Sequence, residues 1–454
     1  MIQKPKLTFW QLWNLSFGFF GVQIAYSLQS ANISRIFATI GADPHTLSFF
    51  WILPPLMGML VQPLVGKYSD RTWTRFGRRI PYLFIGSLIS IAVMCLLPNA
   101  GNFSFSFTGA MIFGLIALML LDTSINMAMQ PFKMLVGDMV GDEQKSKAYS
   151  IQSFLVNAGG IIGFLFPFIF AWLGIANEAP EGQIPDTVKY SFYIGAVILM
   201  LCVLYTSLKV KEMPPHEYAQ FHGLDIEAKQ EKTPGIFTLL EKAPSTFWTV
   251  GLVQFFCWAA FLYMWTYSPG AIADLVWKTT DVKSAGYQAA GNWVGILFAV
   301  QSVGAVLWAL VIPMFKNIKT AYVVSLLLGA AGFASVLLFG KTDFCLLVDS
   351  FGQGYTIDMS AQYLLIISFL LIGIAWAAML AIPFTILTNS LSGGHIGTYL
   401  GLFNGTICLP QIVAAACGGL VLKMVGGVEA NMFLVAGGLL VLGAISVYFV
   451  KIKK

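Results

Sequence analysis

Long apolar stretches, separated mostly by short polar segments, dominate the chain. A hydrocarbon core of about 30 Å requires roughly 20 apolar residues per helix, and each stretch is close to that length or longer. Membrane β-strands would instead alternate over about 10 residues, which excludes a barrel. The pattern therefore predicts an all-α membrane protein with twelve transmembrane helices. The predicted spans are 8–31, 46–66, 80–98, 107–135, 148–173, 190–208, 246–273, 291–314, 320–339, 361–388, 397–422 and 431–450.

One longer polar segment divides these spans six and six. Residues 209–245 are rich in Lys, Glu and Pro, which is typical of a linker. We therefore predict an N-terminal half at 1–208, a cytoplasmic linker at 209–245 and a C-terminal half at 246–454.

Short sequence matches suggest that the two halves are related. Gln130-Pro131-Phe132-Lys133 ends the fourth predicted helix, and Ile382-Pro383-Phe384-Thr385 ends the tenth, 252 residues later. Many secondary transporters are built from such repeats. In this register Ile374 stands where the first half has Asp122, so the charge belongs to the first half alone.

Composition and charge agree with a membrane location. The chain is 57% hydrophobic and only 10% charged, whereas a soluble domain is about 25% charged. Most Lys and Arg residues fall in the tails and in alternate loops, and the positive-inside rule then places both termini in the cytoplasm. We expect a multi-pass protein of the cell membrane, such as a bacterial inner membrane, and we do not expect the net charge of +5 to bind nucleic acid.

Asp122 is the one acid that the pattern places near the centre of a span. An ionised carboxylate there costs from about 2.5 to above 10 kcal/mol, so a chain that keeps one is expected to use it. Asn126 and Gln130 follow at i+4 and i+8 and share its helix face, and Lys133 comes near the inner end. The alternative is a structural carboxylate that pins a neighbouring helix.

The loop after the second helix carries a recognisable motif. It reads Gly66-Lys67-Tyr68-Ser69-Asp70-Arg71-Thr72-Trp73-Thr74-Arg75-Phe76-Gly77-Arg78-Arg79. This resembles the cytoplasmic signature of the major facilitator superfamily, and within it the sucrose-transporter-like branch of the glycoside–pentoside–hexuronide group. The resemblance implies residues that hold the inner side shut, although basic residues here could instead only anchor the loop by the positive-inside rule. The implied gating residues are Gly66, Asp70, Arg71, Arg75, Gly77, Arg78, Arg79 and Asp138.

The fourth helix carries a second match to the same branch. The residues Asp122, Asn126, Pro131, Lys133 and Asp138 stand where the family has Asp, Asn, Pro, Arg or Lys, and Asp. The resemblance implies that Asp122 is the proton-coupling residue and that Lys133 lies on the sugar path. Lys lacks the planar, bidentate contact that Arg makes, so sugar contact by Lys133 is in question. The second helix lacks the acids on which sodium coupling leans in the melibiose-type branch, and this favours H⁺ over Na⁺.

Sugar sites need neutral hydrogen-bonding groups and aromatic faces. A further resemblance in the eleventh helix, Gly401-Leu402-Phe403-Asn404-Gly405, adds an amide to those of other helices. Each candidate could instead be a packing residue, and Trp or Tyr near a span end could anchor the membrane interface. The substrate-binding candidates are Asn126, Gln130, Lys133, Gln23, Tyr26, Asn157, Gln254, Tyr263, Trp376 and Asn404, and further inward-facing candidates are Asn14, Gln29, Trp265, Tyr267 and Gln301.

These features together predict a proton-coupled symporter that imports a disaccharide such as maltose, sucrose or a related glucoside. Burial disfavours the charged form of Asp122, so we expect it to load a proton before sugar binds between the halves near the midplane. The alternatives are a sugar uniporter with a structural Asp122 and a sugar sensor that does not transport. The expected partners are a sugar, H⁺ and the lipid bilayer, with a monomeric chain. We expect no enzyme activity, no cofactor and no metal, since the sequence shows no P-loop, metal-ligand cluster or nucleophile–His pair.

Overall fold

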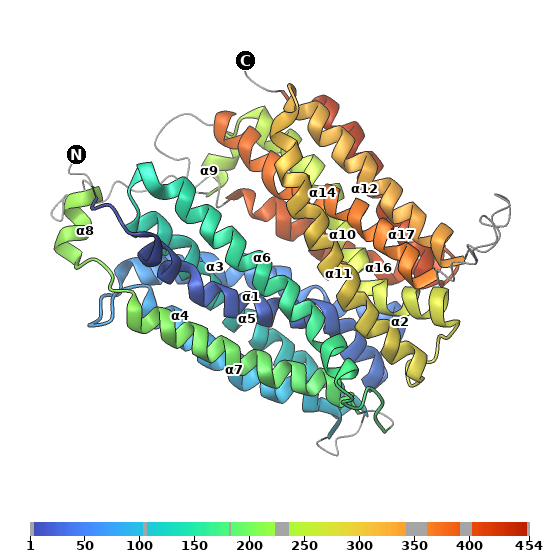
Figure 1. Cartoon of the computed structure of the whole chain (residues 1–454). Helices are drawn as coiled ribbons and strands as arrows, with labels where there is room; N and C mark the ends of the chain where they lie inside the picture. Colours follow the sequence, from blue (N-terminus) through green and yellow to red (C-terminus); the bar gives the residue numbers. More distant parts are fainter. Residues whose placement is uncertain are drawn as a thin grey trace, which may run out of the picture. The chain divides into compact units, whose positions relative to one another are not determined.

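The structure is a computed structural model that describes residues 4–102, 107–180, 183–222, 236–341, 361–390 and 402–451. This part of the chain forms helices and one isolated β-bridge, between Thr74 and Gly77 (Figure 1). The long helices are α1 (Phe9–Ile40), α3 (Leu53–Arg71), α4 (Ile80–Leu96), α5 (Phe107–Met139), α6 (Asp142–Trp172), α7 (Asp186–Lys209), α10 (Ser245–Trp277), α11 (Ala285–Val311), α12 (Ile318–Lys341), α14 (Ala361–Ser390), α16 (Gly405–Met424) and α17 (Met432–Ser446). The short elements are α2 (Pro44–Phe50), α8 (Pro215–His222), α9 (Ile236–Glu241), η1 (Leu97–Asn102), η2 (Ile312–Met314), η3 (Glu429–Asn431) and η4 (Val447–Phe449).

Eleven helical segments of the described residues are long and apolar enough to cross a membrane. They coincide with the second to the twelfth predicted spans, so the chain is an all-helical membrane protein. The predicted first span is also a helix, α1 (Phe9–Ile40), and its length of 32 residues exceeds the roughly 20 that a bilayer requires. It carries more polar side chains than the others, and its crossing of the membrane remains a prediction.

The predicted end of the first helix was wrong, and the second span, although it has a described counterpart, is interrupted. The first helix was predicted to end at residue 31, but α1 continues to Ile40 because Asn32 and Arg35 are buried inside the protein. The predicted second span is two helices, α2 and α3, which are separated at Trp51 and Ile52. Two prolines stand in the first turn of α3, where a helix tolerates the missing N–H.

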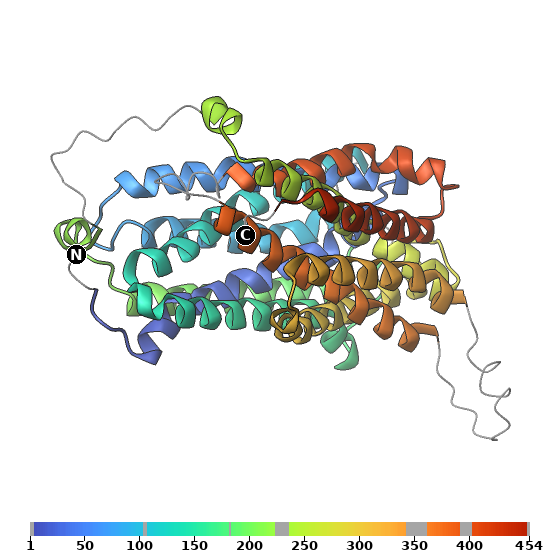
Figure 2. The same ribbon diagram turned by 90° about the horizontal axis from the view of Figure 1, so that it is seen from above.

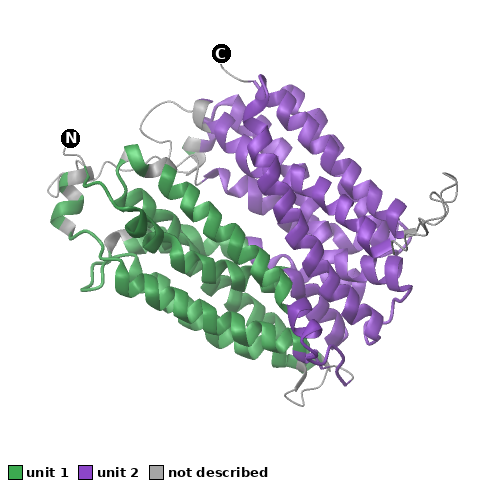
Figure 3. Ribbon diagram, in the orientation of Figure 1, with its two compact units in different colours: residues 1–30, 56–166, 187–239 green, residues 31–55, 167–186, 240–454 purple. Residues whose placement is uncertain are grey.

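The described chain forms two compact units (Figure 3). Unit 1 comprises residues 1–30, 56–166 and 187–239, and unit 2 comprises residues 31–55, 167–186 and 240–454. The predicted halves at 1–208 and 246–454 are each continuous in sequence, whereas each unit combines three segments. The division into these halves remains a prediction. Each unit is described by itself below.

One packing device occurs once in each unit. In unit 1, a Cβ added to Gly86 of α4 would lie 2.8 Å from the carbonyl oxygen of Ser124 on α5, and Ser90 donates a hydrogen bond of 2.8 Å to the Ser124 hydroxyl. The glycine therefore lets the two helices approach closely. Helices of each unit run side by side in both views (Figures 1 and 2).

The equivalent pair in unit 2 is α12 and α14. A Cβ added to Gly332 would again lie 2.8 Å from a serine carbonyl oxygen, that of Ser368, and the hydroxyls of Ser335 and Ser368 lie 2.7 Å apart. Ser368 follows Ser124 of unit 1 by 244 residues, which differs from the sequence offset of 252. In this packing register Ile366, not Ile374, corresponds to Asp122, and the charge still occurs in the first pair only.

Candidate functional site

Asp122 lies inside unit 1 with 1% of its surface exposed. It sits in the middle of α5, and the side chain of Gln29 on α1 donates a hydrogen bond from Nε2 to its Oδ1. The other carboxylate oxygen, Oδ2, and the Gln29 Oε1 are buried without a hydrogen-bond partner among the described residues. The buried side chains of Asp122 and Gln29 therefore each have one oxygen that accepts no hydrogen bond. In the described structure no cation is paired with the Asp122 carboxylate.

A chain of hydrogen bonds joins the backbone oxygen of Asp122 to the side chain of Lys133. The Asn126 Nδ2 donates to the Asp122 backbone oxygen at 2.9 Å, and Asn126 Oδ1 accepts from Gln62 Nε2 at 2.6 Å. The Gln62 Oε1 in turn accepts from Lys133 Nζ at 3.4 Å. The link between Asn126 and Lys133 of α5 is therefore made through Gln62 of α3.

Lys133 does not neutralise Asp122 directly. The two residues are 11 positions apart on α5, which corresponds to about 16 Å along a helix. Lys133 is exposed and contacts Gln62. Among the described hydrogen bonds and ion pairs, none joins Lys133 to Asp122.

The face of α3 that meets α5 is built from two glycines around Gln62. A Cβ on Gly58 would lie 3.4 Å from Asn126 Oδ1, and a Cβ on Gly66 would lie 3.8 Å from Gln130 Nε2. Gly58, Gln62 and Gly66 follow one another at i+4 spacing and so share one helix face. The glycines let α3 approach α5, so that Asn126 contacts Gln62 and Gln130 lies beside Gly66.

Arg78 and Arg79 are buried ion-pair partners of Asp138 at the end of α5. Arg78 Nη2 lies 2.7 Å and Arg79 Nε 2.9 Å from Asp138 Oδ2, and the two arginines are 4% and 1% exposed. Arg79 also donates to the Ser69 hydroxyl, and the Arg78 guanidinium lies 3.7 Å from the ring centre of Tyr218. The arginines therefore bind the loop to α5 and α8, which simple anchoring at the membrane surface would not require.

Glu212 holds this loop from the other side and was not identified from the sequence. Its carboxylate accepts backbone N–H bonds from Arg78 at 3.1 Å, Arg79 at 2.8 Å and Ile80 at 2.8 Å. The Ile80 N–H is an orphan donor of the first turn of α4, and those of Arg78 and Arg79 directly precede the helix. Burial raises the pKa of Glu212 above its ordinary value, and the three backbone N–H groups and the charge of Arg79 offset part of that rise.

The turn before α4 fixes Gly77 in a conformation that glycine alone adopts easily. Gly77 has φ +108°, and its backbone N–H and carbonyl pair with those of Thr74 at 3.0 Å. Arg75, also predicted to gate, is exposed and lies over the ring of Phe76 at 4.7 Å. The side chains of Asp70 and Arg71 lie outside the described part, so their predicted gating role remains a prediction.

The other amide and aromatic candidates of unit 1 are half-buried on α1 and α6. Gln23 lies against Gly160 of α6, whose added Cβ would be 3.9 Å from Gln23 Cγ. Asn157 donates to the Ser153 carbonyl of its own helix at 2.8 Å, and the Tyr26 carbonyl accepts from Ser30 at 2.8 Å. Among the described hydrogen bonds, none joins these three side chains to Asp122.

In unit 2 no described hydrogen bond joins the candidates Gln254, Asn404 and Tyr263 to one another. Gln254 is fully buried and donates to the Met379 carbonyl at 3.2 Å, so it joins α10 to α14. Asn404 is half-buried at the N-cap position of α16. Tyr263 is 5% exposed and its ring centre lies 6.2 Å from that of Tyr267, which is fully buried. Tyr267 lies near the end of a predicted span, where a tyrosine could anchor the membrane interface. Its burial inside the unit argues against that role.

Trp376 belongs to an aromatic cluster in unit 2, defined by Trp51, Trp258, Phe261, Trp265 and Trp376. The Trp376 ring centre lies 5.6 Å from Trp258, 5.0 Å from Phe261 and 5.7 Å from Trp265, and Trp51 stacks on Trp265 at 6.1 Å. Trp265 and Trp376 keep part of their surface accessible. The cluster offers the flat apolar faces on which a sugar ring can stack, and Trp51 was missed from the sequence.

Arg35 is a further buried charge, and it was missed because the first span was predicted to end at residue 31. The side chain is 1% exposed and donates to Gln288 Oε1 at 2.7 Å, Asn292 Oδ1 at 2.7 Å and Asn177 Oδ1 at 3.0 Å. Its hydrogen-bond partners in the described part are neutral amides, not carboxylates. Within unit 2 it therefore fastens the end of α1 to α11 and to the segment after α6.

Comparison with known proteins gives the family. The sequence matches the Major Facilitator Superfamily model over residues 15–362. It is 24% identical to Sucrose transport protein SUT1 of Oryza sativa subsp. japonica over 469 residues, which cover 96% of this chain and 86% of that protein. It is also 24% identical to Sucrose transport protein SUC4 of Arabidopsis thaliana, over 90% of this chain and 83% of that protein. The resemblance to the sucrose-transporter branch is thereby confirmed.

Solved structures agree on the fold. A D-xylose-proton symporter superposes with a TM-score of 0.65 at 15% identity, over 96% of this chain and 95% of that chain. The nucleoside transporter NupG superposes with a TM-score of 0.64 at 15% identity, over 97% of this chain and 98% of that chain. At these identities the likeness concerns the fold alone. Since the family match covers more than half of its length, this chain belongs to the Major Facilitator Superfamily.

Proposed function

We propose that the protein is a proton-coupled sugar symporter that imports a disaccharide by alternating access. The observation that carries the proposal is the buried Asp122 and its amide partner Gln29. Burying a carboxylate inside a membrane protein costs free energy. In this proposal the Asp122 carboxylate is the proton-binding group.

The hydrogen bonds around Asp122 support a change of protonation. Gln29 supplies one donor to Oδ1, and both Oδ2 of Asp122 and Oε1 of Gln29 lack a donor among the described residues. If Oδ2 of Asp122 carried a proton, it could donate a hydrogen bond to Oε1 of Gln29. Neither oxygen would then be an unsatisfied acceptor. Unsatisfied buried acceptors are unfavourable, so protonation relieves a cost that the charged form carries.

The sugar side of the proposal rests on two further observations. The relatives with nearly full-length matches are named sucrose transport proteins, and a shorter match, 23% identical over 46% of this chain and 28% of that protein, is the Proton-associated sugar transporter A of Rattus norvegicus. In unit 2, the partly accessible rings of Trp265 and Trp376 offer stacking faces. In unit 1, the amides of Asn126 and Gln130 offer hydrogen bonds.

In the proposed cycle Asp122 takes a proton from outside, and the loaded protein then binds sugar. The protein changes to the state open to the cytoplasm, in which the proton and the sugar leave. The loop that contains Arg78 and Arg79 is bound to Asp138 of α5 by ion pairs within unit 1. We propose that this bound loop closes the inner side in one state, together with Asp70 and Arg71.

A uniporter with a structural Asp122 is the second candidate. The hydrogen bond from Gln29 to Asp122 would serve equally to fasten α1 to α5. In that case the carboxylate would not exchange protons during transport, and uptake would not depend on a proton gradient.

Uptake into proteoliposomes separates the two. Radiolabelled sucrose and maltose would be offered with an inward proton gradient, with and without a protonophore. Accumulation above the external concentration that the protonophore abolishes is the expected result and identifies the sugar. Uptake that only equilibrates, at the same rate with and without the gradient, would instead establish the uniporter.

A further inference from the structure

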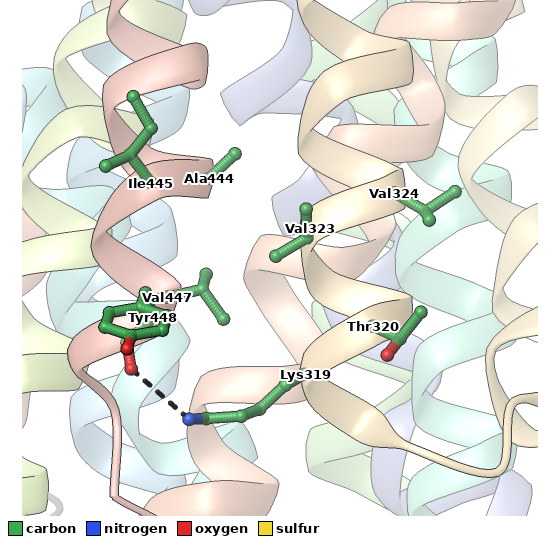
Figure 4. Close-up of a pocket in the computed structure, with 8 residues that line it drawn as sticks. All are labelled: Lys319, Thr320, Val323, Val324, Ala444, Ile445, Val447 and Tyr448. Carbon is green, nitrogen blue, oxygen red and sulfur yellow. Dashed lines mark hydrogen bonds between the residues drawn. The ribbon is translucent and has the colours of Figure 1, made fainter.

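A surface pocket of 450 Å³ lies between α12 and α17, at the end of unit 2 where α12 begins (Figure 4). Its walls are largely aliphatic, and a lysine and a tyrosine stand at its mouth. The lining residues are Lys319, Thr320, Val323, Val324, Ala444, Ile445, Val447 and Tyr448. The pocket is remote in sequence from Asp122 and from the aromatic cluster, and neither proposed role uses it.

We propose that this pocket binds an anionic phospholipid, with an acyl chain between the two helices and the headgroup phosphate at Lys319. Both helices are among those apolar enough to span the membrane. Ile445 is 58% and Tyr448 84% exposed, so this face turns apolar surface outward. A groove of this kind inside a bilayer is filled by lipid chains, and the question is which headgroup it selects.

The charge around the mouth selects a negative headgroup. Lys319 Nζ donates to the Tyr448 carbonyl oxygen at 3.4 Å, and no carboxylate among the described residues lies within ion-pair distance of it. The segments 312–324 and 440–454 contain five lysines and no Asp or Glu. The mouth of the pocket therefore holds the ammonium group of Lys319, which has unused hydrogen-bond donors and basic residues around it. Basic pockets between membrane helices bind anionic headgroups in this way.

The predicted orientation agrees with this assignment. The positive-inside rule places the loop before α12 and the C-terminal tail in the cytoplasm. The mouth of the pocket would then face the inner leaflet, where Lys319 lies at headgroup level and the aliphatic lining of Val323, Val324 and Ile445 lies deeper. Tyr448 beside it is the amphipathic ring typical of a membrane interface.

The test measures binding of two lipids with identical acyl chains to the purified full-length protein. Phosphatidylglycerol and phosphatidylcholine would be titrated in detergent, and bound lipid would be counted by native mass spectrometry alongside the thermal midpoint. We expect phosphatidylglycerol to bind more tightly and to raise the midpoint further. The variant Lys319→Gln should bind phosphatidylglycerol about fivefold more weakly, the effect of one lysine near a charged surface, and should bind phosphatidylcholine as before.

Two controls keep the result specific. Lys423→Gln removes an exposed lysine from the end of α16 in the same unit and should not change either lipid's binding. Val323→Phe narrows the pocket without changing charge and should weaken both lipids. Equal binding of the two lipids by the unmodified protein, or an unchanged preference in Lys319→Gln, would overturn the proposal. Inorganic phosphate at the same concentration should not reproduce the stabilisation, and if it did, the site would recognise free phosphate instead.

Discussion

Gln29 of α1 and Asp122 of α5 are 93 positions apart in the sequence and meet inside unit 1, where the amide donates a hydrogen bond to the carboxylate. The amide supplies a neutral donor to a buried acid, and no cation of the described structure pairs with that acid. A carboxylate held by a neutral donor can gain or lose a proton without breaking an ion pair. The relationship therefore suits a group that titrates during each transport cycle.

Replacing Gln29 should change the pH at which transport operates. Gln29→Leu removes the donor that stabilises the carboxylate, and a hydrogen bond to a charged group contributes about 1.5–3 kcal/mol. The protonated form loses only the neutral acceptor Gln29 Oε1, a weaker bond, so the charged form loses more. The pH profile of gradient-driven uptake should therefore move upward by about one unit. Initial rates of sugar uptake from pH 5 to 9 measure the displacement.

A second buried amide provides the control for this substitution. Gln152 on α6 donates to the Phe132 carbonyl at 3.1 Å and has no contact with Asp122 among the described hydrogen bonds. Gln152→Leu should lower stability without moving the pH profile. An unmoved profile in Gln29→Leu as well would mean that the amide does not set the protonation of Asp122.

Glu212 should make the stability of the protein depend on pH. Burial raises its pKa above the ordinary value of 4.5, so the folded protein holds this proton more tightly than the unfolded chain. The free energy of unfolding therefore falls as the pH rises from the ordinary to the raised pKa. Glu212→Gln keeps an acceptor for the N–H groups of α4 and cannot ionise, so it should lose this fall.

Thermal midpoints of the two proteins in detergent between pH 4 and 8 check this sign. They should agree at the acid end, and the unmodified protein should become the less stable one at the neutral end. Glu217→Gln, which changes an exposed carboxylate of α8, should retain the original pH dependence. A parallel course of Glu212→Gln and the unmodified protein would contradict the account.

Gly77→Ala should destabilise the loop before α4. At φ +108° an added Cβ is strained, and it would also meet the carboxylate of Glu212. The expected loss is at least about 1–2 kcal/mol in the free energy of unfolding. Gly438→Ala is the matched control, because α17 leaves open space around that position and alanine favours a helix by up to about 1 kcal/mol. Equal midpoints for both variants would show that the turn tolerates a side chain.

Arg35 should stabilise unit 2 through its three amide partners. Arg35→Met keeps the length of the side chain but leaves the oxygens of Gln288 and Asn292 without their donor. We expect the free energy of unfolding to fall by about 1.5–3 kcal/mol, measured by thermal or denaturant unfolding. Arg75→Met, at an exposed arginine, should have little effect. A fully stable Arg35→Met protein would mean that the desolvation of the guanidinium cancels its hydrogen bonds.

The helices were predictable because a membrane span needs a long apolar run, and a run is visible in one sequence. Eleven of the predicted spans have a described counterpart that meets the length and apolarity of a membrane helix. The continuation of α1 to Ile40 was missed because Asn32 and Arg35 interrupt the run. Their burial depends on partners such as Gln288, which is 253 positions away.

The site shows the same division between local pattern and distant contact. The face of Asp122, Asn126 and Gln130 follows from helical spacing alone, and it was predicted. The partners Gln29, Gln62 and Glu212 come from other segments, and the sequence contains no periodicity that assigns them. Gln62 lies on α3, and its hydrogen bonds to both Lys133 and Asn126 depend on the approach of α3 to α5.

The most direct test of the central claim follows protons and sugar together. A pH-sensitive dye inside proteoliposomes reports proton entry when sugar is added outside, for the unmodified protein and for Asp122→Asn. The account predicts sugar-dependent proton entry in the former and none in the latter, while exchange of labelled for unlabelled sugar persists in both. Proton entry that continues undiminished in an actively exchanging Asp122→Asn protein would contradict the assignment of Asp122 as the proton-binding group.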